Sequence, residues 1–127
     1  MTETTQPKTD LKKVLIIEDE GDMCLLLEIA LRSESLKISH AKNLAEARQF
    51  MEEDQPDLVL LDNRLPDGFG VDFLSYLKVN HPTVKIIMIT GVDRAARDFA
   101  LEAGADMFLS KPFTQQEIYS SINSLLS

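Results

Sequence analysis

The most informative stretch of this sequence is LVLLDNRLPDGFG, residues 58–70. It opens with four consecutive apolar residues, reaches Asp62, and continues into a loop at residues 63–70 that is rich in proline and glycine. A short run that is apolar at every position is typical of a strand buried on both faces. Two other runs share this character, at residues 14–17 and 86–89. The sequence therefore favours an α/β protein whose parallel sheet is covered by helices on both sides.

Between the apolar runs, hydrophobic residues recur every three or four positions, which indicates amphipathic helices. The first and fourth of these stripes include Leu26 and Phe99. Two further strands, at residues 36–40 and 107–109, complete a pattern in which strand and helix alternate five times. Such units with right-handed crossovers predict a doubly wound, five-stranded parallel sheet. The predicted helices lie near residues 23–31, 44–51, 71–77, 96–103 and 118–125, with caps at Asn43, Gly104 and Thr114, the last in a capping box with Glu117.

The composition narrows the classes of protein to which the chain can belong. The chain has 127 residues, of which 44% are hydrophobic, and this fits one domain with a sizeable core. A single cysteine excludes an intrachain disulfide, and no apolar run approaches the roughly 20 residues of a membrane span or resembles a signal peptide. A net charge of −8 disfavours nucleic acid as a direct partner of this domain. We expect a flexible tail at residues 1–11 and one domain at residues 12–127.

Polar residues follow four of the predicted strands. They are Glu18 and Asp19 after the first, Asp62 after the third, Thr90 after the fourth and Lys111 after the fifth. Each alone is more often a loop residue, helix cap or surface side chain, but parallel strands bring all of them to one sheet edge. Clustered carboxylates repel one another, and Mg²⁺ relieves this with the oxygen ligands that it prefers. The set can support phosphoryl transfer to a carboxylate, with the lysine and the threonine hydroxyl contacting the phosphoryl oxygens.

These residues give the chain a resemblance to a known family. It resembles the receiver domain of two-component response regulators over about residues 13–126. The resemblance implies a flavodoxin-like fold with strand order 2-1-3-4-5. The motifs that carry it are Glu18-Asp19, Asp62 followed by Leu65-Pro66 and Gly70, Thr90-Gly91, and Lys111-Pro112-Phe113.

The resemblance also implies a role for each site residue. Asp62 is expected to accept a phosphoryl group from a histidine of a partner kinase. Asp19 is expected to bind Mg²⁺ directly, Glu18 to help through a water molecule, and Asn63 to offer its main-chain carbonyl to the metal. Lys111 is expected to pair with Asp62 and then with the phosphoryl group.

Further implied roles concern switching and the lifetime of the phosphorylated state. Thr90 is expected to move toward the phosphoryl group on activation, and Phe108 to switch by packing, as it has no hydroxyl group. The Lys111–Pro112 peptide bond is expected to be cis. Arg64 and Val92 stand where the family varies, and our hypothesis is that a bulky cation and an apolar side chain hinder the water that removes the phosphoryl group.

The resulting interpretation is a cytoplasmic signalling switch that turns over no independent substrate. Its expected partners are a sensor histidine kinase or a histidine phosphotransfer protein. A homodimer or an effector would use a face built from parts of residues 93–103, 107–109 and 115–126. Two alternatives stay open: an aspartate-nucleophile phosphatase, although Arg64 stands where such an enzyme has a second aspartate, and a receiver that serves only as a scaffold. A small GTPase is excluded because the chain has no GxxxxGK[ST] loop.

Overall fold

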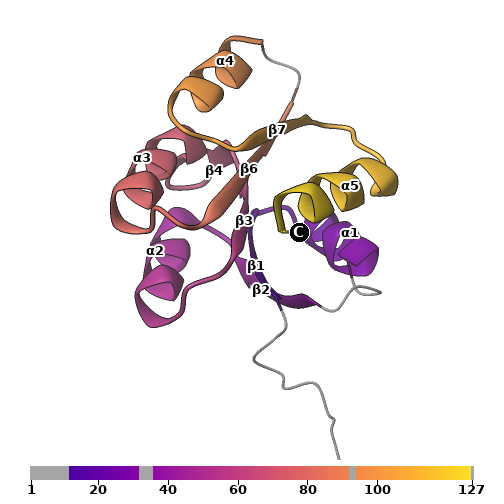
Figure 1. Cartoon of the computed structure of the whole chain (residues 1–127), viewed down its shortest axis with the longest axis horizontal. Helices are drawn as coiled ribbons and strands as arrows, with labels where there is room; N and C mark the ends of the chain where they lie inside the picture. Colours follow the sequence, from indigo (N-terminus) through magenta and orange to yellow (C-terminus); the bar gives the residue numbers. More distant parts are fainter. Residues whose placement is uncertain (1–11, 32–35, 92–93, 127) are drawn as a thin grey trace, which may run out of the picture.

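The computed structural model describes residues 12–31, 36–91 and 94–126, and these form a parallel sheet between two layers of helices (Figure 1). The five strands of the sheet are β1 (Lys12–Ile17), β2 (Leu36–Ala41), β3 (Leu58–Asp62), β6 (Lys85–Thr90) and β7 (Met107–Ser110). The helices are α1 (Gly21–Leu31), α2 (Leu44–Glu53), α3 (Gly70–Asn80), α4 (Arg94–Glu102) and α5 (Gln115–Leu126).

The strands lie in the order β2-β1-β3-β6-β7, and every neighbouring pair in this sheet is parallel. Counted within the sheet alone, this is the order 2-1-3-4-5. Helices α2, α3 and α4 cover one face of the sheet, and α1 and α5 cover the other (Figure 1). The predicted flavodoxin-like α/β fold is therefore confirmed. The expected tail at residues 1–11 lies outside the described residues.

The core explains why the central strands are apolar at every position. Along β3, Leu58 and Leu60 pack into the layer shared with α1 and α5, whereas Val59 and Leu61 pack into the layer shared with α2, α3 and α4. All four of these side chains are almost completely buried. Successive side chains of a strand point to opposite faces, so a strand covered on both sides has no polar face to show.

The three predicted helix caps form as expected. The Asn43 side chain accepts a hydrogen bond from the backbone N–H of Glu46 at 2.8 Å. Thr114 and Glu117 form the reciprocal pair of a capping box, with donor–acceptor distances of 2.8 and 3.0 Å. Gly104 follows α4 with a φ of +111°, a left-handed conformation that favours glycine.

The structure departs from the sequence-based expectation in three places. The loop at residues 63–70 contains a two-stranded ribbon, in which β4 (Arg64–Leu65) pairs with β5 (Gly68–Phe69). Leu26 and Phe99, which belong to the apolar stripes of α1 and α4, are 61% and 58% exposed. The buried contact with the sheet is made by other residues, such as Leu27 in α1 and Ala100 in α4. The buried side of each helix is therefore narrower than its apolar stripe suggests.

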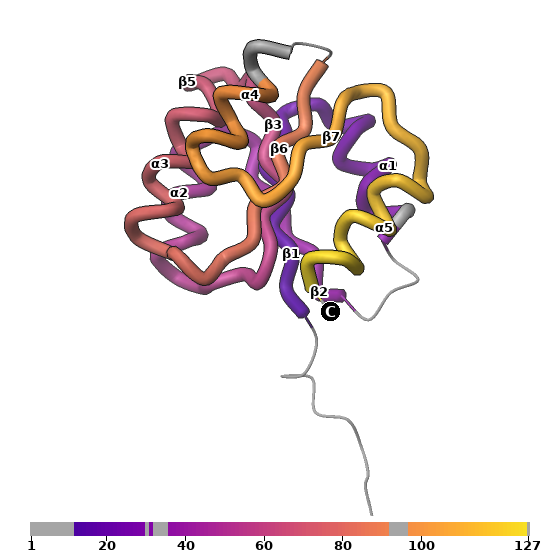
Figure 2. Tube along the Cα trace, turned by 45° about the horizontal axis from the view of Figure 1, so that its top comes forward, coloured from indigo at the N-terminus to yellow at the C-terminus, as the bar shows by residue number. Residues whose placement is uncertain are grey.

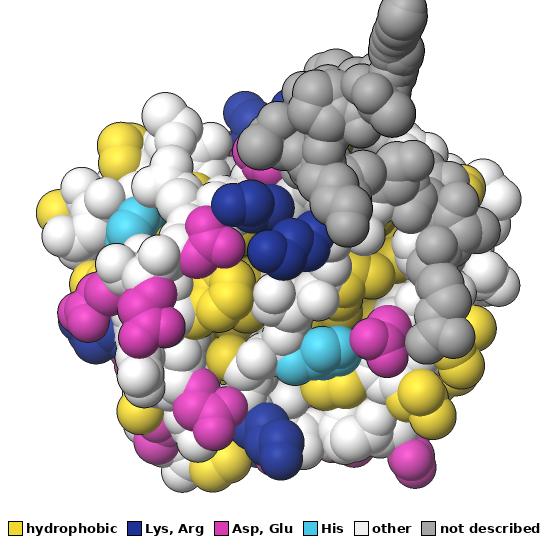
Figure 3. Space-filling model, turned by 90° about the horizontal axis from the view of Figure 1, so that it is seen from below, with side chains coloured by type: hydrophobic (Ala, Val, Ile, Leu, Met, Phe, Trp, Pro, Cys, Tyr) yellow, Lys and Arg dark blue, Asp and Glu magenta, His cyan; other side chains and the backbone are white. Residues whose placement is uncertain are grey.

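One face of the molecule carries charges of both signs. The face seen in Figure 3 has acidic and basic side chains interspersed, with hydrophobic groups between them. Within the described part of the chain, no helix is long and apolar enough to cross a membrane.

Candidate functional site

The sheet register brings four strand ends to one edge of the molecule. Ile17 is level with Leu61, Asp62 is level with Ile89, and Thr90 is level with Ser110. The residues that end or follow β1, β3, β6 and β7 are therefore neighbours in space although they are far apart in sequence. Figure 2 shows the connection from β1 to α1 beside the connection from β7 to α5.

Three carboxylates meet at this edge. Glu18, Asp19 and Asp62 each offer an oxygen, and these three oxygens lie within 4.8 Å of one another. Glu18 and Asp62 are buried, whereas Asp19 is exposed. Oxygen ligands with one face open to water suit a hard cation such as Mg²⁺, which usually keeps several of its water molecules. The donor set therefore fits a divalent cation.

Electrostatic repulsion within the cluster is visible at Glu18. Burial raises the pKa of Glu18, and a hydrogen bond and charge repulsion from Asp62 raise it further, to about 7 from an ordinary value of 4.5. Lys111 opposes this shift without cancelling it. The protein charges alone leave the carboxylates incompletely neutralised, which a bound cation would correct.

Lys111 supplies the positive charge of the site. Its Nζ lies 3.3 Å from Glu18 Oε2, 3.4 Å from Glu20 Oε1 and 3.5 Å from Asp62 Oδ2. Burial by itself lowers the pKa of Lys111, but the negative charges of Asp62 and Glu18 outweigh it and raise the pKa above its ordinary value. The Lys111–Pro112 bond is cis, as the resemblance implied.

Asn63 and Gly70 shape the loop that follows Asp62. The Asn63 side chain accepts a hydrogen bond from the Val71 N–H at 3.1 Å, at the start of α3. Its main-chain carbonyl accepts one from the Gly70 N–H at 2.8 Å, which leaves a second lone pair for another partner. A Cβ on Gly70 would collide with the Asp62 carbonyl oxygen, so this turn requires glycine.

The remaining predicted site residues have different surroundings. Thr90 is buried, and its carbonyl accepts the Lys111 N–H at 2.7 Å. Phe108 is half-buried against the core layer of α2, α3 and α4. Arg64 is exposed, and its backbone N lies 3.5 Å from Asp62 Oδ1, at the limit of a hydrogen bond. Val92 lies outside the described residues.

The family model of the response regulator receiver domain matches residues 14–123 of this chain. The chain belongs to this family. Receiver domains are signalling domains of two-component systems, in which they interact with histidine kinases and effector domains.

Curated relatives of this receiver domain are longer proteins. The response regulator protein PilR of Pseudomonas aeruginosa is 43% identical over 104 residues, which are 80% of this chain and 23% of PilR. The phosphate regulon transcriptional regulatory protein PhoB of Escherichia coli is 30% identical, over 91% of this chain and 52% of PhoB. The chain thus spans about a quarter of the length of PilR and about half of the length of PhoB.

Solved structures agree with the fold. The beryllofluoride-activated NtrC4 receiver domain dimer superposes with a TM-score of 0.86 at 33% identity, covering 91% of this chain and 96% of that one. A CheY-like receiver domain from Methanospirillum hungatei gives a TM-score of 0.86 at 28% identity, covering 91% and 93%. The receiver architecture is therefore shared along almost the whole chain.

One residue of the receiver site was missed in the sequence analysis. Glu20 contacts Lys111, although only Glu18 and Asp19 were selected from the acidic run at residues 18–20. The sequence feature that could have pointed to Glu20 is its place as the third carboxylate of that acidic run. Its part in the site could not be predicted because strand order does not show which side chains of the connection after β1 reach Lys111.

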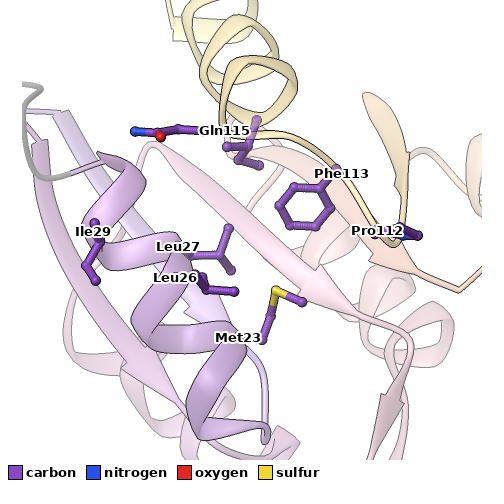
Figure 4. Close-up of a pocket in the computed structure, with 8 residues that line it drawn as sticks. Met23, Leu26, Leu27, Ile29, Pro112, Phe113 and Gln115 are labelled. Carbon is purple, nitrogen blue, oxygen red and sulfur yellow. The ribbon is translucent and has the colours of Figure 1, made fainter.

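A hollow lies between α1 and α5 (Figure 4). It has a volume of about 230 Å³. Its lining is almost wholly apolar, with no ionisable side chain among the described residues that form it, so it offers surface for contact but no group for chemistry. The lining residues are Met23, Leu26, Leu27, Ile29, Pro112, Phe113, Gln115 and Ile118.

Proposed function

We propose that this receiver domain is a phosphorylation-activated switch whose phosphoacceptor is Asp62. The observation that supports this most directly is the setting of Asp62, a buried carboxylate grouped with Glu18 and Asp19 and 3.5 Å from the Lys111 ammonium. The donor would be a phosphohistidine of a sensor histidine kinase or of a histidine phosphotransfer protein, acting in the cytoplasm.

Mg²⁺ is the proposed cofactor. Asp19 and Asp62 would hold it directly, Asn63 would offer its main-chain carbonyl, and Glu18 would act through a water molecule. The bound cation would supply positive charge against the phosphoryl oxygens. Support comes from the donor set itself, because carboxylate and carbonyl oxygens are the ligands that this ion prefers.

In the proposed reaction, an Asp62 oxygen forms a bond to phosphorus. The bond from phosphorus to the donor imidazole nitrogen breaks, and its electron pair leaves with that nitrogen. Lys111 would neutralise charge on the phosphoryl oxygens, and the Thr90 hydroxyl would donate a hydrogen bond to one of them. Hydrolysis of the acyl phosphate by water would return Asp62 to its free form, so the domain would turn over no separate substrate.

The signal would leave the site through Thr90 and Phe108. Thr90 would move toward the phosphoryl group, and Phe108 would repack behind it and bias an equilibrium between two conformations. The responding face would be formed by α4, β7 and α5, where a second copy or an effector would bind. A dimeric, beryllofluoride-activated receiver domain among the similar structures supports a response of this kind.

Mass spectrometry tests the proposal. The domain is incubated with Mg²⁺ and a small phosphodonor, beside the variants Asp62→Asn and Asp72→Asn. Asp72 is an exposed aspartate in the first turn of α3, outside the site, and it serves as the matched control. We expect one phosphoryl adduct on the unaltered chain and on Asp72→Asn, and none on Asp62→Asn. Failure to form an adduct at any Mg²⁺ concentration would favour a scaffold receiver instead.

A further inference from the structure

The ammonium of Lys111 is shared among three carboxylates that differ in their exposure to solvent. Its distances to Glu18, Glu20 and Asp62 are nearly equal, at 3.3, 3.4 and 3.5 Å. The side chains of Glu18 and Asp62 are only 3% and 6% exposed, whereas that of Glu20 is 64% exposed. The lysine therefore stands between two buried acceptors and one acceptor at the surface.

We propose that Glu20 is a positioning residue of the metal site and that it acts through Lys111. Its carboxylate holds the ammonium toward the surface, which leaves oxygens of Glu18 and Asp62 available to a divalent cation. This inference rests on the proposed function and adds to it a residue that regulates the affinity of the site for Mg²⁺.

The backbone of Glu20 is well placed for this role. Its N–H donates to Glu18 Oε1 at 3.2 Å, and its carbonyl accepts the Cys24 N–H at 3.0 Å at the start of α1. The residue is thus tied both to the carboxylate cluster and to a helix. Although its side chain is exposed, the point from which that side chain reaches Lys111 is fixed.

Loss of the outer carboxylate changes the balance at Lys111. Attraction between charges is stronger where water is excluded, so without Glu20 the ammonium would pair more closely with Glu18 and Asp62. A cation in that position competes with Mg²⁺ for the same oxygens. We therefore expect weaker Mg²⁺ binding when Glu20 is neutralised, beyond the effect of removing one negative charge from the surface.

Asp22 provides the control for surface charge. It is an exposed carboxylate in the first turn of α1, two positions from Glu20, and among the described residues its side chain forms no ion pair with Lys111. Asp22→Asn removes the same charge from the same region and leaves the lysine in place.

The experiment measures the Mg²⁺ dissociation constant of the whole chain by isothermal titration calorimetry, without a phosphodonor. We expect Glu20→Gln to raise this constant by about tenfold, the size of effect seen when a partner of a metal ligand is lost, and Asp22→Asn to raise it much less. Glu20→Asp, which keeps the charge on a shorter side chain, should fall between the unaltered chain and Glu20→Gln. In a Lys111→Met background, Glu20→Gln should have no more effect than Asp22→Asn, because the residue it acts through is gone.

Equal effects of Glu20→Gln and Asp22→Asn in the unaltered background would overturn the inference and leave the proposed function standing. The inference would also be overturned, and the proposed function left standing, if Glu20→Gln weakened Mg²⁺ binding to the same extent in the Lys111→Met background. If the unaltered domain bound no Mg²⁺, both the proposed function and this inference would be wrong. Circular dichroism of each variant checks the fold, which we expect the substitutions at Glu20 and Asp22 to leave unchanged because both residues are exposed.

Discussion

At the scale of single residues, the protonation of Glu18 is expected to make the stability of the domain depend on pH. Its pKa in the folded chain is about 7, against an ordinary value of 4.5. Between these values the folded protein binds a proton that the unfolded chain does not, so the free energy of unfolding contributed by this group decreases as the pH rises from 4.5 through 7.

We therefore predict that, in the absence of metal, the domain loses stability between pH 5 and pH 7.5 and that Glu18→Gln loses less. Urea unfolding at the two pH values measures this, and the difference between the two proteins isolates Glu18 from other groups that titrate. Identical pH dependence in both proteins would contradict the assignment. Since a protonated carboxyl cannot bind a metal, the apparent Mg²⁺ affinity should rise over the same range.

Arg64 is the second residue that carries a prediction. It is exposed in β4, two positions after Asp62, where a bulky cation would hinder the approach of water to a phosphoryl group. Replacing it with a smaller side chain, as in Arg64→Asn, is expected to shorten the lifetime of phosphorylated Asp62 by about threefold, equivalent to less than 1 kcal/mol in activation free energy. The decay of the phosphorylated form, followed by mass spectrometry, measures this lifetime. An unchanged lifetime would contradict the hypothesis that Arg64 hinders the attacking water.

At the scale of elements, the turn between β3 and α3 depends on Gly70. A side chain there would collide with the Asp62 carbonyl oxygen, whereas a Cβ on Gly21, at the start of α1, would meet nothing within 4 Å. Gly70→Ala is expected to lower the free energy of unfolding by about 1–3 kcal/mol, and Gly21→Ala to change it little or raise it slightly. Urea unfolding compares the two. Equal effects would mean that the turn tolerates the collision.

The elements also show what sequence patterns can predict. Strand β3 was recognisable because burial on both faces removes every polar position from it, and the caps at Asn43 and Thr114 because their bonds are local. The exposure of Leu26 and Phe99 could not be predicted. Helical spacing identifies the apolar side of a helix, but not the part of that side that meets the sheet. The short β4–β5 ribbon has two residues in each strand, too few for a periodic pattern.

At the scale of the whole molecule, binding of the proposed Mg²⁺ would be linked to folding. A cation that binds only the folded domain stabilises it, by about 2.7 kcal/mol at a concentration 100 times the dissociation constant. We predict that Mg²⁺ raises the melting temperature, that a chelator reverses this, and that Asp19→Asn abolishes the increase. Because Asp19 is exposed, the variant should melt close to the unaltered chain when no metal is present. A Mg²⁺-dependent increase that survives in Asp19→Asn would place the cation elsewhere.

The extent to which the site could be predicted follows from the topology of the sheet. Glu18, Asp62 and Lys111 could be grouped because parallel strands end at one edge, and the structure places them within a few ångströms of each other. Glu20 could not be grouped with them, because its contact depends on how far two side chains reach from the β1–α1 connection to the β7–α5 connection. Strand order predicts which residues are neighbours, but side-chain conformation decides which of them make contact.

The separation of Glu18 and Lys111 by 93 positions has a consequence for protein synthesis. A chain that leaves the ribosome from its N-terminus presents the acidic residues 18–20 and Asp62 well before Lys111 and the strand β7 that precedes it. Until that last strand joins the sheet, Lys111 cannot take its place beside the carboxylates. A nascent chain therefore cannot assemble the complete site until β7 and Lys111 have been synthesised.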